Sequence, residues 1–224
     1  MRSVKVGRPR EHKEATRAAL RAAAERLIAD GGVSAFSVRA VAREVGTTTR
    51  AVYSLFGSTH GLLVDALAQT AFDFLADGIG QIVETDQEVE DLLQVGVVFR
   101  RLVLEHPAVY RIAFQRVVPG FRAGPELTAA RQRAWSALLR KIERLRPSGA
   151  LGGKSAAEAA IQFNAMMEGL ANAELRGSVL RLLPEGQEER SWREALLTVI
   201  RGFAVAGTQP SSAEASDSSA TTAR

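Results

Sequence analysis

Residues 37–63 read SVRAVAREVGTTTRAVYSLFGSTHGLL and predict two short helices on either side of a tight turn. Ser37 suits the N-cap of a first helix that runs to about residue 45, because its hydroxyl can accept a hydrogen bond from the first helical turn. Gly46 ends that helix, and Thr48 suits the N-cap of a second helix over about 49–55. Two short helices joined by a glycine-containing turn form a helix-turn-helix pattern.

Helical spacing of apolar residues extends on both sides of this pattern. A longer helix is expected over about 11–30, with Gly31-Gly32 as its C-cap. Later helices are expected at roughly 59–78, 86–105, 107–117, 125–146, 154–182 and 188–206, separated by Pro and Gly residues. No alternating β-branched run predicts a strand, so the predicted fold class is all-α, with about nine helices.

Positive charge is concentrated at the N-terminus. The whole chain has a net charge of +4. Residues 1–60 hold 11 basic and 5 acidic side chains, a balance of +6, which leaves −2 for the remainder. A basic head on a near-neutral body is typical of a module that binds a polyanion, although a solvated helix face gives the same charge pattern.

Several classes of function are disfavoured by what the sequence lacks. It has no cysteine, and its three histidines, His12, His60 and His106, are scattered without metal-ligand spacing. It contains no GxxxxGK, HExxH or GxSxG motif. We therefore expect no enzyme, no catalytic residue, no metal site and no cofactor. No apolar run suits a membrane span or a secretory signal, so a cytoplasmic protein with no membrane partner is expected.

The segment 37–63 resembles the DNA-binding region of the tetracycline-repressor (TetR/AcrR) family of bacterial transcriptional regulators. The residues that carry the resemblance are Ser37-Val38-Arg39, Val41-Ala42, Gly46, Thr48, Val52-Tyr53, Phe56, Ser58 and Leu62-Leu63, with Gly7-Arg8-Pro9-Arg10 upstream. Two positions depart from the family pattern: Thr47 follows the turn glycine where many members have an apolar residue, and Thr59-His60 replaces the usual Lys-Glu.

The resemblance implies an N-terminal three-helix helix-turn-helix DNA-binding domain and a C-terminal helical domain that binds a ligand and dimerises. The expected division is a basic flexible arm over 1–10, the DNA-binding domain over 11–58, the C-terminal domain over 59–206 and a disordered tail over 207–224, which is rich in Ser, Ala and Thr. The expected partners are duplex DNA with a palindromic operator, a small-molecule effector and a second copy of the chain.

The expected DNA contacts lie at the helix-turn-helix and in the arm. The second short helix would present its N-terminal end to base edges in the major groove. Hydroxyls, helix N-termini and arginines around it would bind phosphates, and the arm would enter the minor groove. The candidate residues are Arg8, Arg10, Ser37, Arg39, Thr47, Thr48, Thr49, Arg50, Tyr53, Ser54, Ser58 and His60.

Large side chains on the central helices are candidates for a ligand pocket. They are Phe72, Phe99, Val103, Tyr110, Phe114, Trp135 and Phe163, with Arg116 and Asn164 as polar anchors. Apolar faces on the last two helices are candidates for a homodimer interface, namely Phe163, Met167, Leu170, Trp192, Leu196, Val199, Ile200 and Phe203. As plain intramolecular core, these residues need neither a ligand nor a partner.

The hypothesis from sequence is thus a repressor that a small, largely apolar ligand releases from its operator. Activation instead of repression stays open, because the same dimer at another promoter position could recruit polymerase. The alternative from a different class is a helical ligand- or partner-binding protein whose basic N-terminus binds an acidic partner rather than DNA. Discrimination between duplex sequences at fixed salt separates the two hypotheses.

Overall fold

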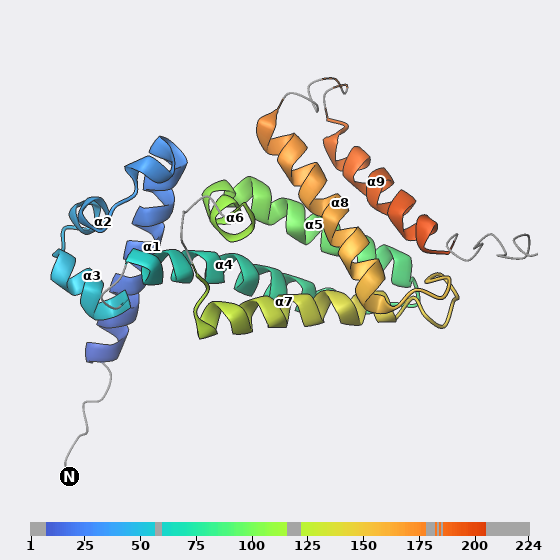
Figure 1. Ribbon diagram of the computed structural model, residues 1–224, viewed down its shortest axis with the longest axis horizontal. Helices are drawn as coiled ribbons and strands as arrows, with labels where there is room; N and C mark the ends of the chain where they lie inside the picture. The colour runs from blue at the N-terminus through green and yellow to red at the C-terminus, as the bar shows by residue number, and fades with distance from the viewer. Residues whose placement is uncertain are drawn as a thin grey trace, which may run out of the picture.

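The computed structural model describes residues 8–56, 60–115, 122–177, 182, 184 and 186–204, and the regular secondary structure of these residues is entirely helical (Figure 1). The described helices are α1 (Arg8–Ala35), α2 (Val38–Glu44), α3 (Thr49–Phe56), α4 (His60–Gly80), α5 (Glu88–Glu105), α6 (Pro107–Phe114), α7 (Pro125–Glu143), α8 (Ala156–Arg176) and α9 (Glu188–Phe203). The predicted all-α fold is therefore confirmed.

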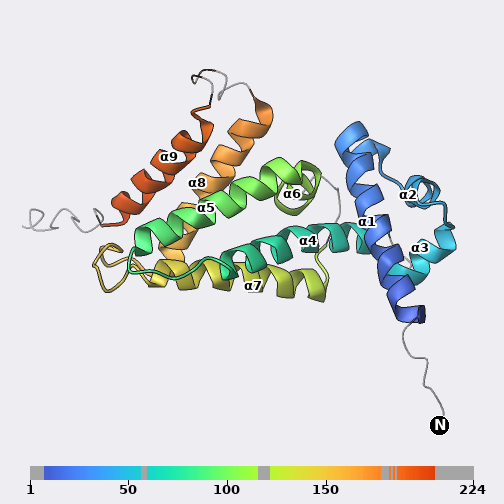
Figure 2. The same ribbon diagram turned by 180° about the vertical axis from the view of Figure 1, so that it is seen from behind.

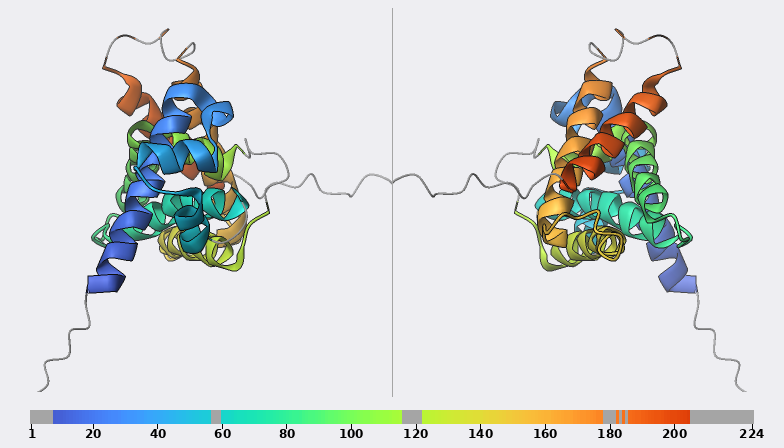
Figure 3. Two further views of the ribbon diagram at one scale, coloured as in Figure 1. Left: turned by 90° about the vertical axis from the view of Figure 1, so that its left-hand side faces the viewer. Right: turned by 90° about the vertical axis from the view of Figure 1, so that its right-hand side faces the viewer.

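Helices α1, α2 and α3 form a unit at one end of an elongated molecule (Figures 1 and 2). Seen end-on, this unit lies in front of the other helices (Figure 3, left). The remaining described helices, from α4 to α9, are called the C-terminal body. The long helix α1 packs against α2 and α3 within its own unit and against α6 of the C-terminal body.

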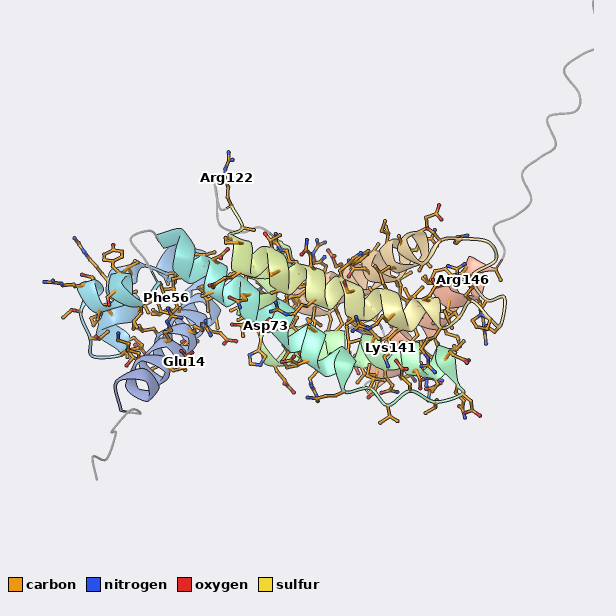
Figure 4. The ribbon with its side chains drawn as sticks, turned by 90° about the horizontal axis from the view of Figure 1, so that it is seen from below. Glu14, Phe56, Asp73, Arg122, Lys141 and Arg146 are labelled. Atoms are coloured by element: carbon orange, nitrogen blue, oxygen red, sulfur yellow. The ribbon has the colours of Figure 1, made fainter. Side chains whose placement is uncertain are left out.

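Helix α4 connects the N-terminal unit to the body and lies along α7 for most of its length (Figures 1 and 4). Buried Asp65 near the start of α4 accepts a 2.9 Å hydrogen bond from the backbone N–H of Gly124, just before α7. At the other end of the pair, the buried ammonium of Lys141 donates to the Ile82 carbonyl and to Glu84. Polar contacts therefore hold both ends of this helix pair together.

Helices α8 and α9 pack against each other and against α5 at the far end from the N-terminal unit (Figure 1). The Glu174 carboxylate on α8 accepts a 2.6 Å hydrogen bond from Arg100 on α5 and a 2.9 Å bond from the indole N–H of Trp192 on α9. The hydrogen bond to Glu174 raises the pKa of Arg100 above its usual value, despite opposition from burial. One carboxylate thus joins three helices.

The predicted boundaries of two helices are wrong. α1 does not end at Gly31-Gly32 but continues to Ala35, because the chain keeps its helical hydrogen bonding up to the segment that leads into the Ser37 cap. It also begins at Arg8, so residues 8–10 of the predicted flexible arm are helical. α8 ends at Arg176 rather than near residue 182, because Gly177 adopts a left-handed conformation (φ +64°) that terminates it.

Candidate nucleic-acid interface

The backbone of the helix-turn-helix is formed by the predicted capping residues. The Ser37 hydroxyl accepts a 3.1 Å hydrogen bond from the N–H of Ala40, and the Thr48 hydroxyl accepts one of 3.2 Å from the N–H of Ala51. Between the helices Gly46 has φ +68°, a conformation that L side chains rarely adopt. The local signals in the sequence therefore correspond to the observed turn.

The inner faces of α2 and α3 pack on α1 and fix the direction of α3. Val41 and Val52 are buried in this core, and Phe56 lies within the N-terminal unit (Figure 4). From α1, Arg17 donates a 2.6 Å hydrogen bond to the carbonyl of Leu55 and places its guanidinium 5.7 Å from the centre of the Phe56 ring. The C-terminal end of α3 is thereby attached to α1, a positioning role for Arg17 that the sequence did not reveal.

The outer face of α3 and its N-cap presents polar side chains to solvent. Arg50, Ser54 and Thr48 are exposed, while Thr47 and Thr49 are half-buried. Tyr53 is 43% exposed, so it does not serve mainly to cover the core. The side chains proposed to contact DNA therefore lie at the N-cap and along the accessible outer face of α3.

Helix α2 adds a second basic surface next to α3. Arg39 is exposed, as predicted, and so is Arg43, which the sequence analysis did not select. Residues four apart on a helix share a face, and this spacing is the signal that would have found Arg43. Two exposed guanidinium groups on one face of α2 suit contacts with neighbouring phosphates of a DNA backbone.

The side chains of four predicted DNA-binding residues are outside the part of the chain that the structure describes. Ser58 lies outside the described residues. Arg8 and Arg10 belong to the first turn of α1, and His60 begins α4, but the side chains of these three residues are not among those described. Their expected contacts stay predictions.

A second feature is a cavity in the body, bounded by α4, α5, α6, α7 and α8, with a volume of about 290 Å³. Five of the predicted pocket residues line it: Phe72, Phe99, Phe114, Trp135 and Asn164. The wall also contains Leu75, Ile79, Val95, Ala134, Leu138 and Met167, and one cation, Arg131, which the sequence analysis missed. The cavity is therefore largely apolar and aromatic.

The remaining predicted pocket residues do not line this cavity. Val103, Tyr110 and Phe163 are fully buried in the packed core. Tyr110 lies behind the wall, where its ring stacks on Phe114 at 5.1 Å and meets Phe99 edge-on at 5.9 Å. Arg116 lies outside the described residues. Large side chains on central helices thus divide between wall and core, and helical spacing alone does not distinguish them.

The hydroxyl of Tyr110 leads to a prediction about stability. It is buried and has no hydrogen-bond partner among the described protein groups. Burial raises the pKa of Tyr110 to about 12, with a smaller contribution from Glu168, so the hydroxyl is neutral at physiological pH. Because an unpaired buried hydroxyl is unfavourable, Tyr110→Phe should increase the free energy of unfolding by about 1 kcal/mol in urea denaturation. Tyr53→Phe, at an exposed hydroxyl, is the control and should change little; a Tyr110→Phe variant less stable than wild type would contradict the prediction.

Most of the residues predicted to form the dimer interface are buried within the single chain. Phe163, Met167, Trp192, Leu196, Ile200 and Phe203 are all buried within a single chain. They form the intramolecular core between α8, α9 and the rest of the body, which was the alternative reading of these faces. Leu170 and Val199 are only half-buried. The outer face of α8 instead carries Ile161, which is 60% exposed.

Two further observations concern the described part of the chain. None of its helices is long and apolar enough to cross a membrane. The described His, Asp and Glu residues form no group of three or more that could hold a metal ion.

A capped helix-turn-helix with a basic outer face, joined to a helical body that contains an apolar cavity, defines the class as an all-α helix-turn-helix protein. Comparison with known proteins gives the family. The family described as "Bacterial regulatory proteins, tetR family" matches residues 20–66, and the "Tetracyclin repressor-like, C-terminal domain" family matches residues 92–199. The chain belongs to the tetracycline-repressor family of bacterial regulatory proteins.

Relatives of known sequence and structure agree with this assignment. The chain is 29% identical, over 128 residues, to HTH-type transcriptional regulators of Mycobacterium bovis and Mycobacterium tuberculosis, covering 56% of itself and 54% of each relative. It therefore spans about half the length of these curated relatives.

Solved structures show the same fold. A Rhodococcus protein of unknown function matches with a TM-score of 0.68 and 24% identity over 84% of this chain and 95% of its own. A TetR-family transcriptional regulator from Thermus thermophilus matches with a TM-score of 0.61 and 19% identity, over 81% and 97% of the two chains.

Proposed function

We propose that the protein is a transcriptional regulator that binds duplex DNA by placing the N-terminal end of α3 in the major groove. The observation that carries this proposal is the exposed group Thr48, Arg50 and Tyr53 on a helix whose opposite face is fixed to α1. Arg50 can bind guanine O6 and N7 as a bidentate pair. Arg39, Arg43 and the hydroxyls around them bind phosphates and set the register.

The regulator works as a two-fold symmetric dimer on a palindromic operator. One short recognition helix reads few base pairs, and a two-fold axis places a second copy one DNA turn away, about 34–36 Å. Because the inner faces of α8 and α9 are used within the chain, the dimer forms through their outer faces. On α8 this face contains Ile161, Ala165 and Gly169 in one i, i+4 row, next to half-buried Leu170. Small residues in that row allow close approach of a partner helix.

A small-molecule effector occupies the cavity and changes the affinity for DNA. Phe72 on α4 and Phe114 on α6 both line the cavity, and their rings lie 5.1 Å apart. At the start of α6, His106 contacts Glu25 of α1 at 2.8 Å between Nδ1 and Oε1. Movement of α4 or α6 is thus passed to the N-terminal unit directly. The protein dissociates from its operator if the ligand binds the DNA-incompetent state more tightly than the DNA-binding state. It therefore acts as a repressor on DNA in the bacterial cytoplasm.

Selection of binding sites from random duplex DNA tests this function. The wild type should enrich a palindromic sequence, and the triple variant Thr49→Ala, Arg50→Ala, Tyr53→Ala should bind that site about a hundredfold or more weakly, since each bidentate contact is worth about 1–3 kcal/mol. Affinities are measured by fluorescence anisotropy at two salt concentrations.

Arg146→Ala is the matched control, because it also removes one positive charge but lies at the end of the molecule far from α3 (Figure 4). It should bind like the wild type. No enriched site, or equal binding by the triple variant, would contradict DNA reading by α3. In that case the basic N-terminus would bind an acidic partner instead.

A further inference from the structure

The cavity wall contains one charged side chain. Of the described residues that line it, only Arg131 and Asn164 are polar. Arg131, on α7, is half-buried and holds its guanidinium 5.3 Å from the centre of the Phe72 ring. A guanidinium stacked on an aromatic face keeps its N–H groups in the plane of the fork, where they can still donate hydrogen bonds.

Arg131 differs from the other half-buried arginines of the body in having no acidic partner among the described residues. Arg100 is paired with Glu174 at 2.6 Å, and Arg144 with Asp91 at 2.6 Å. A half-buried cation that borders an apolar wall is stabilised further when an anion pairs with it. The structure thus provides a positive group next to the cavity whose partner is not a described side chain.

The second polar residue of the wall, Asn164, lies next to a negative charge rather than carrying a positive one. Asn164, on α8, donates one of its two amide N–H groups to the Glu168 carboxylate at 2.6 Å, so a negative charge lies beside it. An anion in the cavity is attracted by the Arg131 guanidinium and repelled by the Glu168 carboxylate next to Asn164. The two polar residues together define a direction for a bound molecule.

The cavity volume limits the size of that molecule. About 290 Å³ is the space of about ten liquid waters, at roughly 30 Å³ each, and holds a compact molecule of about 10–14 non-hydrogen atoms. The rings of Phe99, Phe114 and Trp135 offer apolar and edge-on contacts to its body.

We propose that the cavity binds a small amphipathic carboxylate, whose carboxylate pairs with Arg131 and whose apolar or aromatic body lies against Phe99, Phe114 and Trp135. A planar fork and a carboxylate form a bidentate, charge-assisted pair, which selects acids over neutral analogues of the same shape. The inference names the effector class of the proposed regulator, and it rests on that proposed function only for the effect of binding on DNA.

Calorimetric titration with three compounds of one shape tests the proposal: 4-phenylbutyrate, its neutral amide 4-phenylbutanamide, and the cationic 4-phenylbutylamine. The wild type should bind the carboxylate about tenfold or more tightly than the amide, and the amine most weakly. Arg131→Met, which keeps an unbranched apolar stem, should bind carboxylate and amide equally, with unchanged affinity for the amide. Arg140→Met is the control, because it removes the same charge from an exposed site on α7 outside the cavity, and it should keep the preference.

Each contrary result overturns the proposal. In the wild type alone, equal binding of carboxylate and amide would contradict the proposal, and so would failure of all three compounds to bind. Among the variants, a preference for the carboxylate that persists in Arg131→Met would contradict it. Loss of that preference in Arg140→Met would contradict it as well. Because these titrations contain no DNA, their failure leaves the DNA-binding function standing if an operator is selected. Conversely, carboxylate binding without a selected operator would contradict the regulator and leave the ligand site intact.

Discussion

Phe163→Ala is expected to lower the free energy of unfolding by about 3–5 kcal/mol, because it removes a fully buried aromatic ring and leaves a cavity that the neighbouring helices cannot fill. The decrease should appear in urea denaturation at every protein concentration, since the ring packs within one chain. A loss that disappears at high protein concentration would place Phe163 in an intermolecular contact instead.

Ile161→Glu, two residues earlier on the same helix, is the matched comparison. Ile161 is 60% exposed, so the substitution should leave the fold of the single chain intact. It should shift the monomer–dimer equilibrium toward monomer in sedimentation velocity, because it places a charge on the proposed dimer face. An Ile161→Glu protein that dimerises like the wild type would exclude this face of α8 from the interface.

Glu174→Gln is expected to have the second largest effect, a loss of about 2–3 kcal/mol, which is less than for a fully buried pair because water reaches part of the site. The side chains of Arg100 and Glu174 are 20% and 10% exposed. A glutamine can still accept the hydrogen bond from Trp192, but it removes the hydrogen-bonded counter-charge of the Arg100 guanidinium. Urea denaturation measures the change.

Glu90→Gln is the control for this experiment. Glu90 and Arg193 form a similar two-bond pair between α5 and α9, with N···O distances of 2.5 and 2.7 Å, but the side chains are 41% and 49% exposed. Exposed pairs contribute little, so Glu90→Gln should unfold almost like the wild type. Equal losses in the two variants would show that burial does not govern the strength of these pairs. The double variant Arg100→Met, Glu174→Gln should recover part of the loss, because it removes the unpaired cation and keeps an acceptor for the indole N–H of Trp192.

The sequence predicted the helix-turn-helix well because its boundaries are set by local chemistry. Ser37 and Thr48 cap helices through bonds to residues three positions away, and Gly46 provides a backbone conformation that other residues avoid. Gly31-Gly32 misled the prediction because glycine allows a helix to end without requiring it. Whether the helix continues depends on contacts made by the whole unit.

The two faces of α8 show why helical spacing alone cannot assign a dimer interface. Apolar residues occupy both the inner face, with Phe163 and Met167, and the outer face, with Ile161 and half-buried Leu170. Helical spacing identifies each face as apolar, but it does not say which one the chain covers itself. Arg131 was missed for a related reason: a lone arginine on a helix is usually solvated, and only its position beside Phe72 reveals the cavity.

Because α4 is long, a small rotation at its cavity end moves its other end by several ångströms. Its 21 residues form a rod of about 32 Å at about 1.5 Å per residue. A tilt of about 5° about the cavity end of such a rod displaces the other end by about 3 Å. In the proposed two-fold dimer both α3 helices would move, so their separation would change by up to about 6 Å, close to two base-pair steps of about 3.4 Å. In the proposed regulator, a ligand that tilts α4 by this amount would move the two α3 helices out of register with the grooves of the operator.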